Sequence, residues 1–163
     1  MKSKISHCLG FDPQPEDAAR FYTAIFKDSK ITALSRYPDA GQEIHGKPAG
    51  SVMTVDFELD GHPFAALNGG PHFKFNEAIS FQIECATQEK VDYYWEKLGE
   101  GGDPNAQKCG WLKDQFGLSG QVVPEGMHEV LNDPDPTKSK RAFQAMMQMN
   151  KLDLAALQRA FAG

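Results

Sequence analysis

The stretch "PEDAARFYTAIF" (residues 15–26) decides the fold, because its pattern returns in "TQEKVDYYWEKLGEGG" (residues 87–102). In both stretches apolar side chains recur three and four residues apart. This period places them on one face of an amphipathic helix. The two apolar stripes match at a constant offset, in which Ala18 corresponds to Val91. The sequence therefore predicts two similar helices in two similar pieces of chain.

Short apolar-rich or alternating segments flank both predicted helices. They predict strands at residues 4–11, 29–37, 51–59, 62–67 and 78–85. Asp60-Gly61 is a strong hairpin signal between two of them. After the second helix, "QKCGWLKDQFG" and "SGQVVP" indicate two further strands. The pattern predicts an α+β fold in which a β-α-β-β-β unit is used twice, over residues 1–70 and 76–125.

The turn Asn68-Gly69-Gly70-Pro71 lies between the two predicted units. A phosphate-binding loop needs glycines that lead directly into a helix N-terminus. Here an alternation of aromatic and polar residues follows and leads into a strand. We therefore interpret the turn as a joint between units, in preference to a phosphate site.

Composition and charge exclude several classes of partner. The net charge of −5 argues against nucleic acid, and no apolar run approaches the roughly 20 residues of a membrane span. Neither nucleic acid nor membrane is expected as a partner.

Cys8, Cys85 and Cys109 are odd in number and lack CxxC spacing, which is typical of reduced thiols. The N-terminus reaches Asp12-Pro13 too early to contain the apolar segment of a signal peptide. Together with the reduced thiols, this feature predicts a cytoplasmic protein.

The C-terminal tail, residues 126–163, belongs to neither predicted unit. A helix is expected from Pro136 or Thr137, and Asp153 is a candidate N-cap of a final helix. The apolar face of the tail, rich in methionine, suits either a partner surface or the cover of a sheet in its own chain. Symmetric pairing is the commonest assembly, so we predict a homodimer that uses part of this tail.

The arrangement resembles the PhnB-like branch of the vicinal oxygen chelate superfamily, which includes glyoxalase I, bleomycin-resistance and fosfomycin-resistance proteins and extradiol dioxygenases. The resemblance rests on four segments, "FD…PEDAARFYTAIFKDSKI" (11–31), "TVDFELDGHPFAALNGGPHFKFNEAISFQIEC" (54–85), "VDYYWEKLGEGG" (91–102) and "CGWLKDQFGLSGQVVP" (109–124). It implies paired half-barrels in one glyoxalase/bleomycin-resistance-like domain, residues 1–163, with C-terminal helices. Some members of this branch carry the label 3-demethylubiquinone-9 3-methyltransferase.

The resemblance also implies where metal ligands would stand. The first-strand ligand of each unit falls on His7 and on Ser80, and the last-strand ligand falls on Gln121. Only His7 can bind a transition metal well, and one imidazole does not make a site. The chain is therefore expected to lack a metal and any other cofactor. The branch carries a bulky aromatic residue where this chain has Gly120, so we expect either a gap beside Gln121 or a space that a ligand or the neighbouring chain fills.

These inferences predict a cleft with a polar, uncharged floor that binds a small organic ligand. Its expected residues are His7, Asn68, Ser80, Gln82 and Gln121, with Trp111 and Phe116 either as pocket walls or as plain core. The alternative is an enzyme of the superfamily, either a metal-dependent lyase, isomerase or dioxygenase, or the methyltransferase of the label. A sequestering or scaffold dimer without chemistry is the third reading.

Overall fold

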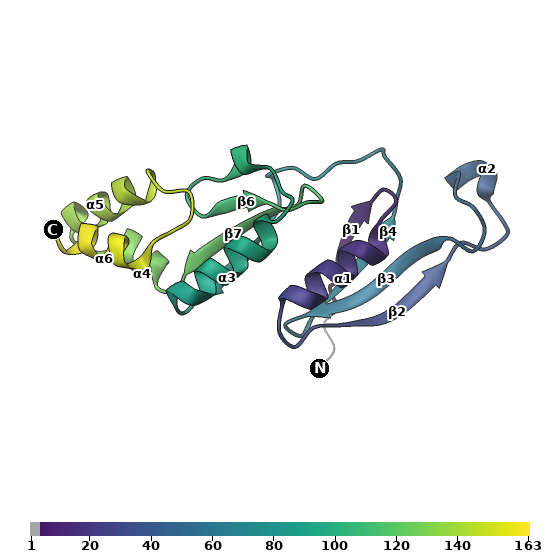
Figure 1. The fold of residues 1–163 in the computed structure, drawn as a ribbon, viewed down its shortest axis with the longest axis horizontal. Coiled ribbons are helices and arrows are strands. Elements are labelled where there is room, and N and C mark those ends of the chain that lie inside the picture. The colour runs from purple at the N-terminus through teal and green to yellow at the C-terminus, as the bar shows by residue number, and fades with distance from the viewer. Residues whose placement is uncertain (1–3) are drawn as a thin grey trace. The chain divides into compact units, whose positions relative to one another are not determined.

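The computed structural model describes residues 4–163, and the chain divides into two compact units after Lys74 (Figure 1). Unit 1 ends at Lys74 and unit 2 begins at Phe75. No helix within residues 4–163 is long and apolar enough to cross a membrane. The α+β class predicted from the sequence is confirmed, because each unit carries helices on a mixed sheet.

Unit 1 contains a four-stranded sheet in the order β1-β4-β3-β2. Its elements are β1 (His7–Phe11), α1 (Pro15–Ile25), β2 (Lys30–Arg36), the short α2 (Gln42–His45), β3 (Val52–Leu59) and β4 (His62–Asn68). The first strand, β1, runs parallel to β4, while β3 is antiparallel to both β4 and β2. The hairpin predicted at Asp60-Gly61 joins β3 to β4, and both turn residues have positive φ, 49° and 75°. Positive φ at both positions is what a two-residue hairpin turn requires.

The core of unit 1 lies between its sheet and α1. Alternate residues of β3 are buried, with Val55, Phe57 and Leu59 each at most 5% exposed. Tyr22 of α1 stacks on Phe57 with ring centroids 6.3 Å apart. Every second side chain of β3 and the apolar face of α1, which repeats every 3.6 residues, thus pack together in one apolar layer.

Unit 2 contains a three-stranded sheet in the order β5-β7-β6. Its elements are β5 (Ser80–Cys85), α3 (Gln88–Gly99), the 3-10 helix η1 (Pro104–Ala106), β6 (Trp111–Lys113), β7 (Ser119–Pro124), α4 (Met127–Leu131), α5 (Pro136–Met146) and α6 (Leu154–Ala162). The outer strand β5 runs parallel to β7, and β6 is antiparallel to β7. In its described residues this sheet has one strand fewer than the predicted β-α-β-β-β unit.

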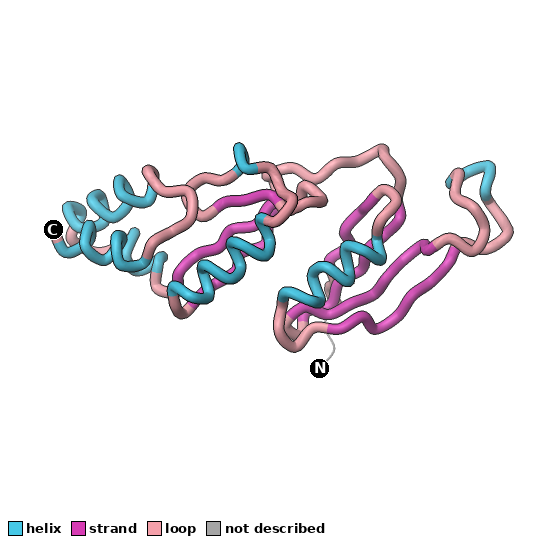
Figure 2. Tube along the Cα trace, in the orientation of Figure 1, coloured by secondary structure: helices cyan, strands magenta, loops and turns pink. Residues whose placement is uncertain are grey.

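The strand that the repeated pattern requires between α3 and β6 is replaced by turns. Figure 2 shows residues 100–110 as loop apart from η1. Asp103 caps η1 by accepting a hydrogen bond from the Asn105 amide at 2.9 Å. Lys108 and Trp111 then close a two-residue turn through two backbone hydrogen bonds. These local hydrogen bonds occupy backbone N–H and C=O groups that would pair with a neighbouring strand if the segment were a longer strand.

The C-terminal tail packs within unit 2. Gln88, the first residue of α3, donates from Nε2 to the Leu152 carbonyl at 3.2 Å and accepts from the Leu154 amide at 2.9 Å. Leu152 itself is only 1% exposed. The helices α5 and α6 pack against each other, and the Arg141 guanidinium bonds the last carbonyls of α6. The tail therefore covers part of its own chain.

Candidate functional site

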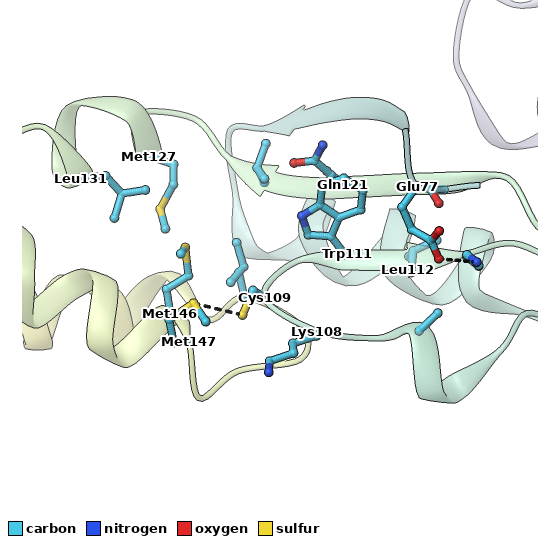
Figure 3. A pocket seen from close by; sticks show the side chains of 15 residues that line it. Glu77, Lys108, Cys109, Trp111, Leu112, Gln121, Met127, Leu131, Met146 and Met147 are labelled. Carbon is cyan, nitrogen blue, oxygen red and sulfur yellow. Dashed lines mark hydrogen bonds and ion pairs between the residues drawn. The ribbon is translucent and has the colours of Figure 1, made fainter. Parts of the chain in front are cut away.

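A pocket of about 700 Å³ lies in unit 2, between one face of the sheet and the C-terminal helices (Figure 3). The alternation of side chains along β7 shows which face of the sheet lines the pocket. Gly120 and Val122 are buried on the side of α3, so Ser119, Gln121 and Val123 point to the other side. The α4 and α5 helices supply the opposite wall.

The polar groups of this pocket are few and mostly paired. Gln121 Nε2 donates to Ser80 Oγ at 2.8 Å, across the parallel pair β5–β7. Ser119 Oγ is buried beneath the pocket and has no hydrogen-bond partner among the described residues. At the edge, Lys113 forms an ion pair with Glu77, and the hydrogen bond from Lys113 holds the pKa of Glu77 below its ordinary value. Such a site can orient a ligand by hydrogen bonds on an otherwise apolar surface.

The apolar wall carries sulfur atoms. Met127 of α4, Met146 at the end of α5 and Met147 directly after it line the pocket, together with Cys109 from the turn before β6. Cys109 Sγ lies 3.8 Å from Met147 Sδ. By contrast, Cys85 is 1% exposed on the α3 side of the sheet, and burial raises the pKa of its thiol to about 11. Cys85 is therefore a core residue without access to a ligand.

The structure brings together part of the predicted site. Trp111 and Gln121 line the pocket, and Ser80 is bonded to Gln121. Gln82 shares this face of β5 and pairs in register with Gln121, but its side chain is exposed and outside the lining. Phe116 lies in the turn between β6 and β7, where its backbone amide donates to Asp114 Oδ1 at 2.9 Å. It does not line the pocket either.

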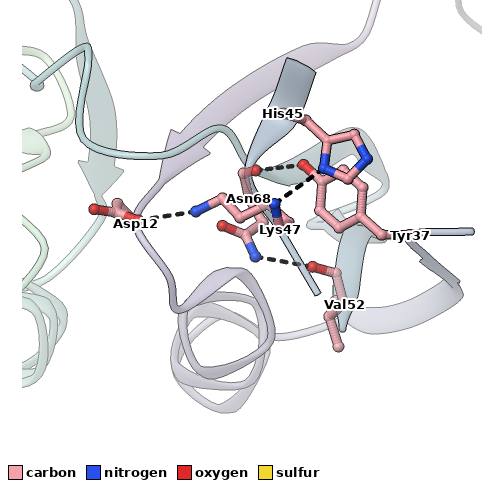
Figure 4. Close-up of polar contacts among 6 residues, drawn as sticks. All are labelled: Asp12, Tyr37, His45, Lys47, Val52 and Asn68. Atoms are coloured by element: carbon pink, nitrogen blue, oxygen red, sulfur yellow. Dashed lines mark hydrogen bonds and ion pairs between the residues drawn. The ribbon is translucent and has the colours of Figure 1, made fainter. Parts of the chain in front are cut away.

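Asn68 lies in unit 1, where it holds the end of β4 (Figure 4). Its Nδ2 donates to the Val52 carbonyl at 3.0 Å, and its own carbonyl accepts from the Tyr37 hydroxyl at 2.7 Å. Its Oδ1 is buried without a partner among the described residues and borders a smaller pocket of about 540 Å³. Asn68 thus joins two strands and a loop of unit 1.

His7 faces the helix side of the unit 1 sheet. Its ring stacks on Phe64, with centroids 5.0 Å apart, and Phe64 stacks in turn on Phe57 in the core. His7 stands two residues before the buried Leu9, whereas Ser80 stands three residues before the buried Ile83. The predicted correspondence of His7 with Ser80 is therefore wrong by one residue, which in a strand exchanges the two faces.

The gap expected at Gly120 is also wrong. Gly120 is on the α3 side of β7, where a Cβ atom would meet Leu112 Cδ1 at 3.5 Å and Ile83 Cδ1 at 3.8 Å. These are ordinary van der Waals contacts, so the two side chains fill the space that a larger residue would occupy.

Residues that could hold a divalent metal do not gather in the part of the chain that the structure describes. Within residues 4–163, no three His, Cys, Asp or Glu side chains lie together as a possible metal site. The site residues predicted from the sequence did not include the sulfur-bearing side chains that line the pocket. The methionine-rich face was visible in the sequence, but the position of the tail against the sheet was not.

Comparison with known proteins adds the family. A sequence model of the family described as 3-demethylubiquinone-9 3-methyltransferase matches residues 3–123. Among solved structures, a PhnB protein from Bacillus cereus is 32% identical, covering 75% of this chain and 99% of its own, with a TM-score of 0.63. No curated protein matches the chain.

Two further structures are more distant. Protein PA1353 from Pseudomonas aeruginosa is 18% identical, with a TM-score of 0.58, and covers 76% of this chain and 98% of its own. The fosfomycin resistance protein of Listeria monocytogenes is 16% identical, with a TM-score of 0.49, and covers 79% of this chain and 98% of its own. With the family match over most of the chain, the conclusion is that this protein belongs to the PhnB-like 3-demethylubiquinone-9 3-methyltransferase family.

Proposed function

We propose that this protein is a cytoplasmic, PhnB-like binding protein that takes a small organic ligand into the pocket of unit 2, without a divalent metal or an organic cofactor. The observation that carries the proposal is the pocket itself. Its volume of about 700 Å³ is within the range of small-molecule sites, roughly 300–1,000 Å³. Trp111 offers an aromatic surface and Gln121 an amide, on strands that the sheet holds in place.

The alternative is an enzyme, and the family description favours methyl transfer over the metal-dependent reactions of the superfamily. A methyltransferase of this kind must bind S-adenosylmethionine before any transfer. Titration of the protein with S-adenosylmethionine in a calorimeter separates the two functions. We expect no binding heat, whereas saturable binding with one site per chain would favour the enzyme.

Gln121→Ala is expected to weaken ligand binding roughly tenfold, because an amide that pairs with a bound ligand contributes about 1–1.5 kcal/mol. Small organic compounds are first screened by thermal shift, in protein dialysed against EDTA. Binding is then followed by the fluorescence of Trp111 in a Trp95→Phe background, where Trp111 is the remaining one of two tryptophans. Dialysis against EDTA should leave the melting temperature unchanged.

Gln144→Ala is the matched control, since Gln144 is exposed on α5 and outside the pocket lining. It should leave the affinity within twofold of the original protein. If no compound changes Trp111 fluorescence, or if both glutamine variants weaken binding equally, the pocket is not the ligand site.

We further infer that the two units form one glyoxalase/bleomycin-resistance-like domain built from an internal repeat. The support is the parallel pairing of the first and last strands of each sheet, β1 with β4 and β5 with β7. In both units the helix that follows the first strand packs on that sheet.

We also propose a homodimer. Phe143 of α5 and Met147, directly after this helix, are 50% and 39% exposed, which is more apolar surface than a solvent-facing segment needs. Light scattering at micromolar concentration should give twice the mass of the single chain. Phe143→Glu should shift the mass toward the monomer, while the neighbouring Gln144→Glu should not. A monomeric original protein would contradict the dimer.

A further inference from the structure

Four sulfur-bearing side chains form one wall of the unit 2 pocket. We name Cys109, Met127, Met146 and Met147 the sulfur cluster. Four of the six methionines of the chain fall within residues 127–149, and three of those four line the pocket. Figure 3 shows the sulfur atoms of Met127, Met146 and Met147 on the side of the pocket where Cys109 lies. Thiolate and thioether sulfur are soft ligands, which select soft metal ions such as Cu(I).

The backbone fixes the position of Cys109. Lys108 and Trp111 close a two-residue turn through backbone hydrogen bonds of 2.9 and 3.0 Å, with Cys109 and Gly110 at its centre at φ values of 53° and 85°. The amides of Cys109 and Gly110 donate to the carbonyls of Met149 and Asn150, both at 2.8 Å. A non-glycine residue with positive φ persists only where its surroundings enforce it. The C-terminal segment therefore ties Cys109 to the end of α5, from which Met147 extends.

The spacing of two of the sulfur atoms suits a shared metal. Cys109 Sγ and Met147 Sδ are 3.8 Å apart. With metal–sulfur bonds of about 2.3 Å, two sulfurs at this distance subtend an angle of about 110° at the metal. Met146 and Met127 line the same pocket, and methionine has three rotatable bonds with which its sulfur can adjust to a ligand.

We propose that the sulfur cluster binds one soft monovalent metal ion, Cu(I), through the Cys109 thiolate and the Met147 thioether, with Met146 and Met127 completing the coordination. Binding replaces the thiol proton, which is released to solvent, and leaves the oxidation states of metal and sulfur unchanged. Hard divalent ions prefer oxygen ligands and should not compete. The proposal does not rest on the binding of an organic ligand.

The test is a titration of the full-length, reduced protein with Cu(I) under anaerobic conditions, in competition with the chromogenic chelator bicinchoninate. One equivalent should be withheld from the chelator, and a near-ultraviolet thiolate-to-copper absorption band should appear. Cys109→Ser should lose both the equivalent and the band. The matched control is Cys8→Ser, because Cys8 is an exposed thiol in unit 1 and should leave both unchanged.

A second pair of variants tests the thioether. Met147→Leu should weaken Cu(I) binding at least tenfold, whereas Met53→Leu, in β3 of unit 1, should leave it unchanged. Circular dichroism and thermal melting of each variant check that the fold is kept. Equal retention by Cys109→Ser and Cys8→Ser, or full affinity in Met147→Leu, would overturn the proposal. A stoichiometric Zn(II) or Mn(II) site at the same residues would also overturn it.

Discussion

Leu152→Ala is expected to lower the free energy of unfolding by about 3 kcal/mol, within the range of about 2–5 kcal/mol seen for buried leucines. Leu152 is 1% exposed and lies against Gly110, where a Cβ atom on that glycine would approach Leu152 Cδ1 to 3.0 Å. Its carbonyl accepts from Gln88 of α3. Removing the side chain leaves a cavity where the tail meets both the turn before β6 and α3.

Urea denaturation, followed by circular dichroism, measures this loss. Leu34→Ala is the control, since Leu34 is 40% exposed in β2 and its truncation should change stability by no more than about 1 kcal/mol. Equal effects at the two positions would show that the tail is not part of the folded core of unit 2.

Gly102→Ala is expected to destabilise unit 2 by roughly 3 kcal/mol or more, because the new methyl group has no room. A Cβ atom at Gly102 would overlap the backbone carbonyl oxygen of Lys113 and come within 3.3 Å of the Asp114 carbonyl carbon. These contacts are to backbone, so no side-chain rotation relieves them. The loop after α3 would have to move away from β6.

Gly10→Ala provides the comparison, because a Cβ atom at Gly10 meets nothing within 4 Å and its φ is not in the left-handed region. That variant should melt within a few degrees of the original protein in a calorimeter. If Gly102→Ala melts like Gly10→Ala, the close approach of the loop to β6 is wrong.

The helices of both units were predictable because their side-chain periodicity and caps are local. α1 and α3 fall at Pro15–Ile25 and Gln88–Gly99, within three residues of the stretches 15–26 and 87–102 in which they were predicted. The predicted cap at Asp153 is confirmed, since its Oδ1 accepts from the Ala156 amide at 2.8 Å. In α3, Thr87 Oγ1 accepts from the Lys90 amide at 3.3 Å. α2 and α4 have four and five residues, too few to show a helical period.

The strand segments of both units were predictable, but the β-α-β-β-β pattern calls for a fourth strand that unit 2 lacks in its described residues. In unit 2 the segment before β6, residues 100–110, consists mostly of polar residues and glycine, and Cys109-Gly110 turns the chain back on itself. A turn of this kind usually carries Asn-Gly or Asp-Gly, so Cys-Gly gave no signal. The predicted equivalence of His7 and Ser80 is wrong for a related reason. The loop between the first strand and the helix is one residue longer in unit 1 than in unit 2, so the two side chains lie on opposite faces of their sheets.

The candidate site was predictable only where it lies on the strands. Ser80 and Gln121, which the resemblance placed at first-strand and last-strand ligand positions, share one face of neighbouring strands. The opposite wall comes from α4 and α5, and the amphipathic pattern of a helix does not state which surface it covers. Contacts between residues far apart in the sequence determine that surface. They include those of Gln88 with Leu152 and Leu154, 64 and 66 positions apart, and the backbone bonds of Cys109 and Gly110 to Met149 and Asn150.

That long connection sets the order in which a ribosome can complete the two units. Unit 1 has all its strands once β4 ends at Asn68, and its first strand then pairs with its last. Unit 2 lacks its anchor for α3 until Leu154 has been synthesised. At about 5–20 residues per second, the interval between these points is roughly 4–17 s. During that time a folded unit 1 is joined to a nascent chain whose pocket still lacks a wall.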